Sequence, residues 1–176
     1  MKFTNYISNR DIYEKVILEQ IPKAKKFVWI ATADVKDLYV QKEKRFVPFL
    51  QVLSELIKKG ISIRILYAKE PGPAFRKDFD KYPLLIKNLE KMLCPRNHMK
   101  MIIVDGIFAY LGSANLTGAG LGAKKSENRN FESGIITNDN KIVEPMMKDF
   151  DEIWMGLFCR NCNRKSYCLD PLIHTF

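Results

Sequence analysis

One stretch of the sequence combines side chains that can transfer a phosphoryl group. His98 and Lys100 lie two residues apart at the start of an apolar run, so both point to the same face of an extended strand. A neutral imidazole is a competent nucleophile, and an ammonium beside it can hold the charge of phosphate oxygens during transfer. Ser113 and Asn115 follow the next apolar run, where their hydroxyl and amide groups would complete a phosphate cradle. Asp105 is expected to form the intervening turn, with its carboxylate binding nearby donors and taking no direct part in the chemistry.

These residues, together with Gly112, make up a known signature. From His98 to Asn115 the chain matches His-x-Lys-x4-Asp and the trailing Gly-Ser-x-Asn of the phospholipase D superfamily, so it resembles that family. The resemblance implies an α/β/α sandwich around a mixed, partly parallel sheet, with Asp105 and Gly112 as structural support of the motif. It also implies a phosphodiesterase that works through a covalent phosphohistidine and without a catalytic metal ion.

The same resemblance implies a role for each side chain of the motif. His98 is the nucleophile, while Lys100, Ser113 and Asn115 bind the phosphate, Lys100 and Asn115 as part of the catalytic set. The Asn-Phe-Glu segment that ends at Glu132 is similar to the family segment whose glutamate orients the catalytic imidazole. Glu132 is therefore the candidate for that role, and an ordinary surface charge is the alternative.

The number of histidines predicts how the site is completed. The usual reaction of the family needs two histidines, one to attack and one to protonate the leaving oxygen. The chain has only His98 and His174, and His174 lies too near the end of the sequence to begin a second motif. We therefore expect a homodimer in which two chains share one site across a two-fold axis, as in the small single-motif nucleases that the chain resembles.

Composition points to an anionic partner. The 176 residues carry a formal charge of +9, with a pI near 9.4. Two clusters of basic residues flank the motif: Lys87, Lys91 and Arg96 before it, and Lys124, Lys125 and Arg129 after it. Nucleic acid, DNA or RNA, is the expected partner, and a solvated lysine-rich surface is the alternative. No apolar stretch is long enough to span a membrane, and the N-terminal residues do not look like a signal peptide, so a cytoplasmic protein is expected.

Hydrophobic periodicity predicts alternating helices and strands, which favours an α/β fold with partly parallel strands. We expect a catalytic domain over residues 1–156 and a cysteine-rich tail over 157–176, packed on the same domain. A polar loop is expected over residues 33–47, and the Pro-Gly-Pro sequence at 71–73 should interrupt regular secondary structure. The expected helices are 10–25, 48–59, 84–90 and 141–154, and the expected strands are 27–32, 61–67, 91–94, 99–104, 107–111 and 134–136.

Four cysteines form the second chemical feature. Cys159, Cys162 and Cys168 lie within ten residues, and Cys94 is the only other cysteine. Without a secretory signal, this spacing favours metal binding over disulfides, and a structural zinc ion is the leading prediction. Cys94 is the preferred fourth ligand and His174 the alternative. An iron–sulfur cluster on the four thiols, or no metal at all, are the other possibilities.

The sequence therefore predicts a metal-independent phosphodiesterase, a hydrolase that cleaves DNA or RNA as a homodimer. Two alternatives remain open. One is a catalytically weak dimer that only binds nucleic acid, and the other is a lipid phosphodiesterase.

Overall fold

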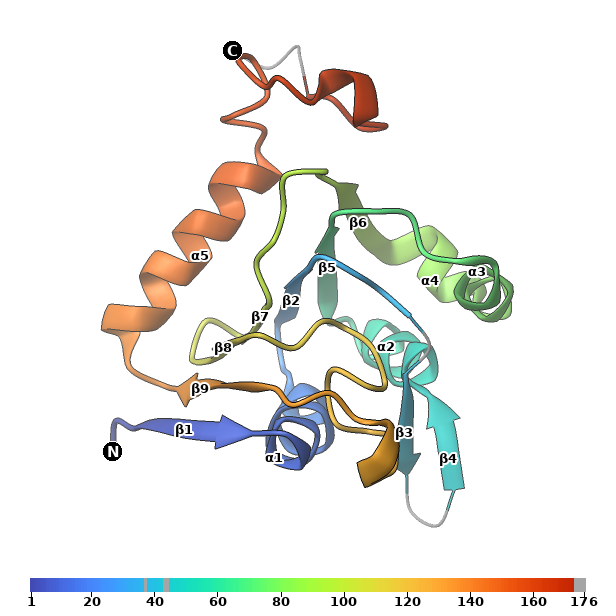
Figure 1. The fold of residues 1–176 in the computed structure, drawn as a ribbon, viewed down its shortest axis with the longest axis vertical. Coiled ribbons are helices and arrows are strands. Elements are labelled where there is room, and N and C mark those ends of the chain that lie inside the picture. The colour runs from blue at the N-terminus through green and yellow to red at the C-terminus, as the bar shows by residue number, and fades with distance from the viewer. Residues whose placement is uncertain (37, 43–44, 173–176) are drawn as a thin grey trace.

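A computed structural model describes residues 1–36, 38–42 and 45–172 of the chain (Figure 1). Its centre is a seven-stranded mixed sheet in the order β1-β9-β8-β7-β2-β5-β6, and a separate hairpin pairs β3 with β4. The large sheet contains β1 (Thr4–Ser8), β2 (Phe27–Thr32), β5 (Ser62–Tyr67), β6 (Leu89–Leu93), β7 (Met101–Val104), β8 (Phe108–Gly112) and β9 (Ser133–Thr137), and the hairpin contains β3 (Tyr39–Lys42) and β4 (Arg45–Pro48).

Helices cover both faces of the sheet, and α5 runs alone along one side in Figure 1. The helical segments are α1 (Arg10–Ile12), η1 (Tyr13–Gln20), η2 (Ile21–Lys23), α2 (Phe49–Lys58), α3 (Pro73–Phe79), α4 (Pro83–Asn88), η3 (Ser126–Asn128), α5 (Asn140–Trp154) and η4 (Lys165–Tyr167). Among the described residues, none of these helices is both long and apolar enough to cross a bilayer. The layers form the predicted sandwich around a mixed sheet, so the fold expectation is confirmed.

The central strand β2 shows why the sequence contains continuous apolar runs. Val28 and Ile30 belong to the core under α2 and the N-terminal helices, whereas Trp29 and Ala31 belong to the core under α5. The ring of Trp29 stacks on Phe150 of α5, with 5.0 Å between ring centroids. Because both faces of the strand are covered, every position favours an apolar side chain, and the strand lacks the alternation of apolar and polar residues that is typical of a half-exposed strand.

The strand directions bring one end of each of the seven strands to the same edge of the sheet, including the end of β1, where Ser8 lies opposite Ser133. The strands β2, β5 and β6 are parallel, so they all end there. The strand β7 is antiparallel to β2 and therefore begins at that edge, with Met101 beside Ala31. The strand β8 ends there and β9 begins there, since Gly112 lies opposite Gly134. We call this the catalytic edge, because the candidate site residues His98, Lys100, Ser113, Asn115 and Glu132 all lie in the segments that meet at it.

Several predicted elements need correction. The segment after β2, expected to be a polar loop, forms the hairpin of β3 and β4 because Val40 is buried and the backbone N–H of Gln41 donates to the hydroxyl of Tyr13 at 2.7 Å. Pro73, which was expected to interrupt secondary structure, begins α3, where its fixed φ and missing N–H suit the first helical turn. The edge strand β1 was not predicted, because it is mostly exposed and lacks an apolar pattern.

Asp105 fastens the turn between β7 and β8 to the start of β2. Its backbone has a positive φ of 55°, which aspartate tolerates better than most residues. Its carboxylate accepts hydrogen bonds from the backbone N–H groups of Lys25 at 2.8 Å, Lys26 at 2.7 Å and Phe27 at 2.9 Å. The carboxylate thus ties down backbone donors, at the far end of β7 from His98.

We expect Asp105→Ala to lower the free energy of unfolding by about 3 kcal/mol, because three backbone donors lose a charged acceptor and alanine is strained at positive φ. Asp105→Asn keeps one carbonyl oxygen and tolerates the turn, so its loss should be clearly smaller. Urea unfolding of both variants measures the difference. Equal stability of Asp105→Ala and the parent would show that these contacts do not hold the turn.

Candidate active site

His98 and Lys100 form a close pair in the extended segment that enters β7. The Nζ atom of Lys100 lies 3.1 Å from Nε2 of His98 and donates to the carbonyl oxygen of His98 at 2.8 Å. The imidazole is exposed, whereas Lys100 is only 8% exposed. Burial lowers the pKa of Lys100, and the carboxylate of Glu132 opposes that shift. The two side chains share one face as expected, although β7 begins only at Met101, after them.

A residue that the sequence did not indicate holds this segment in place. Asn97 is buried, and its side-chain Nδ2 donates to the backbone carbonyl oxygens of Thr32 at 2.9 Å and Leu66 at 3.1 Å, near the ends of two parallel strands. Its side-chain Oδ1 accepts from the backbone N–H of Met99 at 3.1 Å. Asn97 thus spans β2 and β5 and fixes the backbone on both sides of His98. The only local signal was a polar residue directly before the motif.

Ser113 and Glu132 meet where β8 ends and β9 begins. The hydroxyl of Ser113 donates to one carboxylate oxygen of Glu132, and the amide of Asn130 donates to the other at 3.1 Å. The backbone N–H of Glu132 donates to the side chain of Asn9 at 3.1 Å. Among the described residues, the side-chain hydrogen bonds of Glu132 therefore go to Ser113 and Asn130 and not to His98.

The oxygen and the nitrogen of the Asn115 side-chain amide have different surroundings. The side-chain Oδ1 accepts from the backbone N–H groups of Ala33 at 3.1 Å and Asp34 at 3.2 Å, just after β2. Thr32 supports the same junction, because its buried hydroxyl oxygen accepts from the backbone N–H of Leu116 at 2.9 Å. The oxygen of Asn115 is thus used to hold the loop after β2, and its NH2 group is the part that can donate to a phosphate.

Gly112 lies where two strands and a tyrosine approach closely. A Cβ atom at this position would overlap the hydroxyl of Tyr110 and the carbonyl oxygen of Ser133. Tyr110 is buried, and burial raises the pKa of its phenol to about 12. The neutral hydroxyl accepts from the backbone N–H of Ala114 at 3.4 Å. Only glycine therefore allows Tyr110 to reach under the segment that carries Ser113.

The four cysteines are all described and all line one cavity, of about 200 Å³, beside the end of β6. Within the described ranges, no three side chains of His, Cys, Asp or Glu converge closely enough to enclose a single metal ion. His174, the alternative fourth ligand, lies outside the described residues. The metal site stays a prediction at this point.

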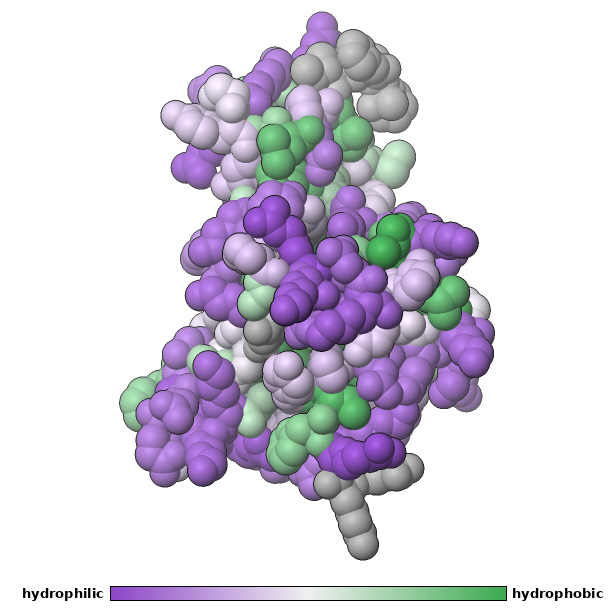
Figure 2. All heavy atoms as spheres, turned by 90° about the vertical axis from the view of Figure 1, so that its right-hand side faces the viewer, coloured by the Kyte–Doolittle hydropathy of each residue, from purple (hydrophilic) through white to green (hydrophobic). Residues whose placement is uncertain are grey.

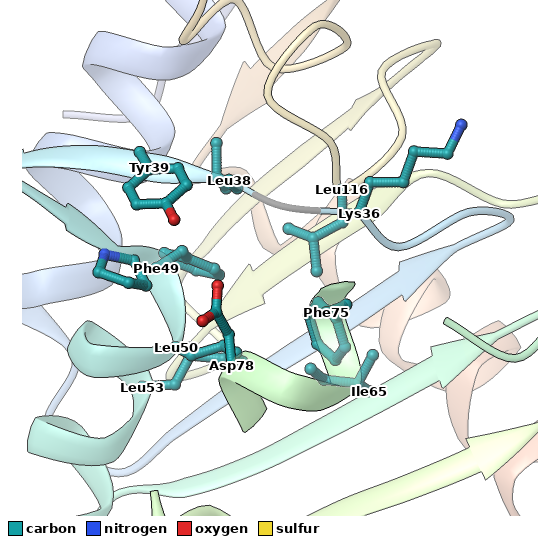
Figure 3. A pocket seen from close by; sticks show the side chains of 11 residues that line it. Lys36, Leu38, Tyr39, Phe49, Leu50, Leu53, Ile65, Phe75, Asp78 and Leu116 are labelled. Atoms are coloured by element: carbon teal, nitrogen blue, oxygen red, sulfur yellow. The ribbon is translucent and has the colours of Figure 1, made fainter. Parts of the chain in front are cut away.

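A second cavity, shown in Figure 3, lies between the β3–β4 hairpin, α2 and α3. Its walls are mostly apolar, the carboxylate of Asp78 is its main acidic group, and the ammonium of Lys36 points away from it. Its volume of about 20 Å³ is room for about one water molecule. His98 is not among its lining residues, so this cavity is separate from the candidate active site.

The chain matches one family model and several curated proteins of similar sequence. Residues 17–154 match the family model described as "Cardiolipin synthase, PLD-like domain". A cardiolipin synthase of Clostridium perfringens (strain 13 / Type A) is 26% identical over 132 residues, which are 69% of this chain and 26% of that protein. The major cardiolipin synthase ClsA of Bacillus subtilis is 27% identical over 61% of this chain and 23% of its own length. The chain spans about a quarter of the length of the curated relatives it matches.

Solved structures show the same fold. NucT from Helicobacter pylori superposes with a TM-score of 0.64 at 18% identity, covering 88% of this chain and 96% of that one. The phospholipase D family member Nuc from Salmonella typhimurium gives a TM-score of 0.62 at 18% identity, covering 88% and 95%. The archaeal chromatin protein TrmBL2, described with a novel mode of DNA binding, gives 0.59 at 15% identity over 86% of this chain and 51% of its own.

Proposed function

This chain belongs to the phospholipase D-like family, and from that premise we propose that it is a metal-independent phosphodiesterase that cleaves DNA or RNA in a site shared by two chains. The observation that carries the proposal is the pair of His98 and Lys100 at the catalytic edge. Ser113 and the NH2 group of Asn115 lie in segments that meet at the same edge. A nucleophile, a fixed positive charge and neutral donors are what transfer of a phosphodiester needs.

The geometry suggests how the reaction starts. In the tautomer in which the Lys100 ammonium donates to Nε2 of His98, that nitrogen is unprotonated and its lone pair can attack phosphorus. Lys100 has three N–H donors, and a phosphate oxygen arriving between the two side chains takes one of them from the imidazole. The carbonyl oxygen of His98 keeps a second donor at 2.8 Å, which holds the ammonium in place. The nucleophile is thus released when the substrate's charge arrives.

The chemical steps balance with a second imidazole. Nε2 of His98 forms a bond to phosphorus while the bond to the leaving oxygen breaks, and His98 of the partner subunit gives that oxygen its proton. The partner's imidazole then takes a proton from water, whose oxygen attacks phosphorus and releases His98. His98 is exposed in a single chain, and a partner covering it would supply this imidazole and exclude bulk water.

Charge supports a nucleic-acid substrate. Besides the net charge of +9, Arg96 lies exposed in the segment after β6, and Lys124 and Lys125 lie exposed in the loop between β8 and β9. All three belong to segments that begin or end at the catalytic edge. In the proposed complex they would contact phosphates on either side of the one that is cleaved, and such contacts make binding sensitive to salt.

Lipid phosphodiesters are the second candidate substrate, because the relatives similar in sequence are named cardiolipin synthases. The short length of the match relative to those proteins leaves this activity as the alternative. A dimer that binds nucleic acid without cleaving it is the third reading, and DNA binding by the chromatin protein of the same fold is compatible with it.

One experiment separates the three activities. We expect the protein to cleave single- or double-stranded DNA or RNA, and the rate to change by less than about twofold in excess EDTA, because the nucleophile and the charge come from side chains. Phosphatidyl lipid vesicles, assayed in parallel for headgroup release, should not react. Loss of cleavage in EDTA by a folded dimer would overturn the mechanism. Tight, salt-sensitive binding without cleavage, or headgroup release alone, would replace the proposed function with one of the alternatives.

A further inference from the structure

The tail after α5 brings three cysteines to a fourth that lies 65 residues earlier in the chain. Cys159, Cys162 and Cys168 line the cavity of about 200 Å³ together with Cys94, which directly follows β6. Apolar side chains of β6, α5 and the tail form most of the remaining wall, and Arg96 and Lys165 complete it. In Figure 2 the tail is the upper part of the molecule, where hydrophobic side chains lie among hydrophilic ones.

Specific contacts hold the tail against this strand end. The backbone N–H of Leu93 donates to the carboxylate of Asp170 at 3.2 Å, and the guanidinium of Arg164 donates to the carbonyl oxygen of Pro95 at 3.1 Å. The thiol of Cys168 lies 3.8 Å from the carbonyl oxygen of Leu93. The tail consists of turns and one short helix, and its described residues are exposed or half-buried. A segment with so little core of its own would gain order from a cross-link.

The surroundings of one thiol suit a bound thiolate. The backbone N–H of Arg164 donates to Sγ of Cys162 at 3.4 Å. Backbone N–H groups directed at sulfur are a usual second layer around metal–thiolate centres. In the cavity itself, the positive charges of Arg96 and Lys165 would offset a centre of net negative charge.

The arrangement of the thiols around the cavity favours one of two kinds of centre. A zinc ion requires all four sulfurs about 2.3 Å from one point. In the described chain the cysteines instead line the wall of a cavity, and no three of them converge on a single-ion position. A four-iron cluster contains several irons and bridging sulfides, so it holds its cysteine sulfurs apart around a larger volume.

We propose that Cys94, Cys159, Cys162 and Cys168 bind an iron–sulfur cluster of the four-iron type, which cross-links the tail to the segment leading into His98. Three of the ligands come from one short sequence and the fourth from the end of β6. Cys94 lies four residues before His98, and the backbone N–H of Asn97 donates to its carbonyl oxygen at 2.8 Å. The cluster would therefore anchor the same segment that Asn97 fixes from its other side.

The test is metal and sulfide analysis of the full chain, produced with iron and cysteine supplied and purified without oxygen. We expect about four irons and four acid-labile sulfides per chain, with a brown colour. Cys94→Ser and Cys162→Ser should each lose most of the iron and sulfide. Ser166 is an exposed residue of the same tail, so Ser166→Ala should keep the full iron and sulfide content and serves as the matched control.

The metal and sulfide content of the parent protein decides the outcome even if a cysteine variant fails to fold. About one zinc per chain in a colourless protein would overturn the cluster in favour of a single ion. Iron without sulfide, or no metal, would overturn it as well. Iron and sulfide retained in both cysteine variants would show that these thiols are not the ligands. None of these readings depends on cleavage activity, so they are independent of the proposed function.

Discussion

Replacing His98 with alanine is expected to lower the rate of phosphodiester cleavage by roughly 10⁴-fold or more. In a shared site one substitution removes both imidazoles, the nucleophile and the proton donor, so no partial mechanism remains. The fold should be unaffected, because the side chain is exposed and its hydrogen bonds go to Lys100. The free energy of unfolding should change by less than about 1 kcal/mol. Cleavage of labelled DNA or RNA and urea unfolding measure the two quantities.

His98→Gln is the matched control for size and polarity, and it should be as inactive as the alanine variant. Acid quenching during turnover should trap a phosphate adduct on His98 in the parent and none in either variant. A variant that keeps more than about a tenth of the parent rate would exclude His98 as the nucleophile.

Mixed dimers test whether the site is shared. When equal amounts of parent and His98→Ala chains exchange partners, about a quarter of the dimers carry two imidazoles. Activity per parent chain should therefore fall to about half of its unmixed value. Unchanged activity per parent chain would mean that each chain works alone, and a fully active monomer in sedimentation would lead to the same conclusion.

Replacing Lys100 with methionine is expected to lower kcat by about 10²–10³-fold, which is the second large effect. Among the described residues, the ammonium of Lys100 is the buried positive charge beside His98, and phosphate oxygens gain negative charge as the transition state forms. Methionine fills the same space and removes a charge whose burial is unfavourable, so stability should be kept or slightly raised. Because burial lowers the pKa of Lys100, the parent rate should fall at a lower alkaline pH than an exposed lysine would give.

Two variants serve as controls for Lys100. Lys100→Arg keeps a positive charge throughout this pH range but is too long to keep both contacts to His98, so an intermediate rate is expected. Lys124→Met removes an exposed charge at the same edge and should mainly weaken binding and its salt dependence. A kcat for Lys100→Met within about threefold of the parent would show that Lys100 does not act in the transition state.

Local sequence patterns were sufficient to predict the motif and most of the helices and strands. The spacing of His98 and Lys100 predicted a common face, because extended backbone places alternate side chains together whatever lies around it. The apolar runs predicted β2 and β5, since strands covered on both faces need apolar residues at every position. Asp105 was expected to be a turn residue because its side chain acts on nearby backbone and tolerates positive φ.

The tertiary structure decided what lies beside what. Sequence patterns contain no strand order, so only the fold shows that β2, β5, β6, β7, β8 and β9 meet at one edge. Asn97 was missed because its partners belong to other strands, and the contacts of Glu132 with Ser113 and Asn130 depend on how β8 and β9 pair. The gathering of Cys94 with the tail cysteines likewise required the fold. The physical reason is the same in each case: periodicity and turn preference depend on neighbours in the chain, whereas these contacts join residues far apart in sequence.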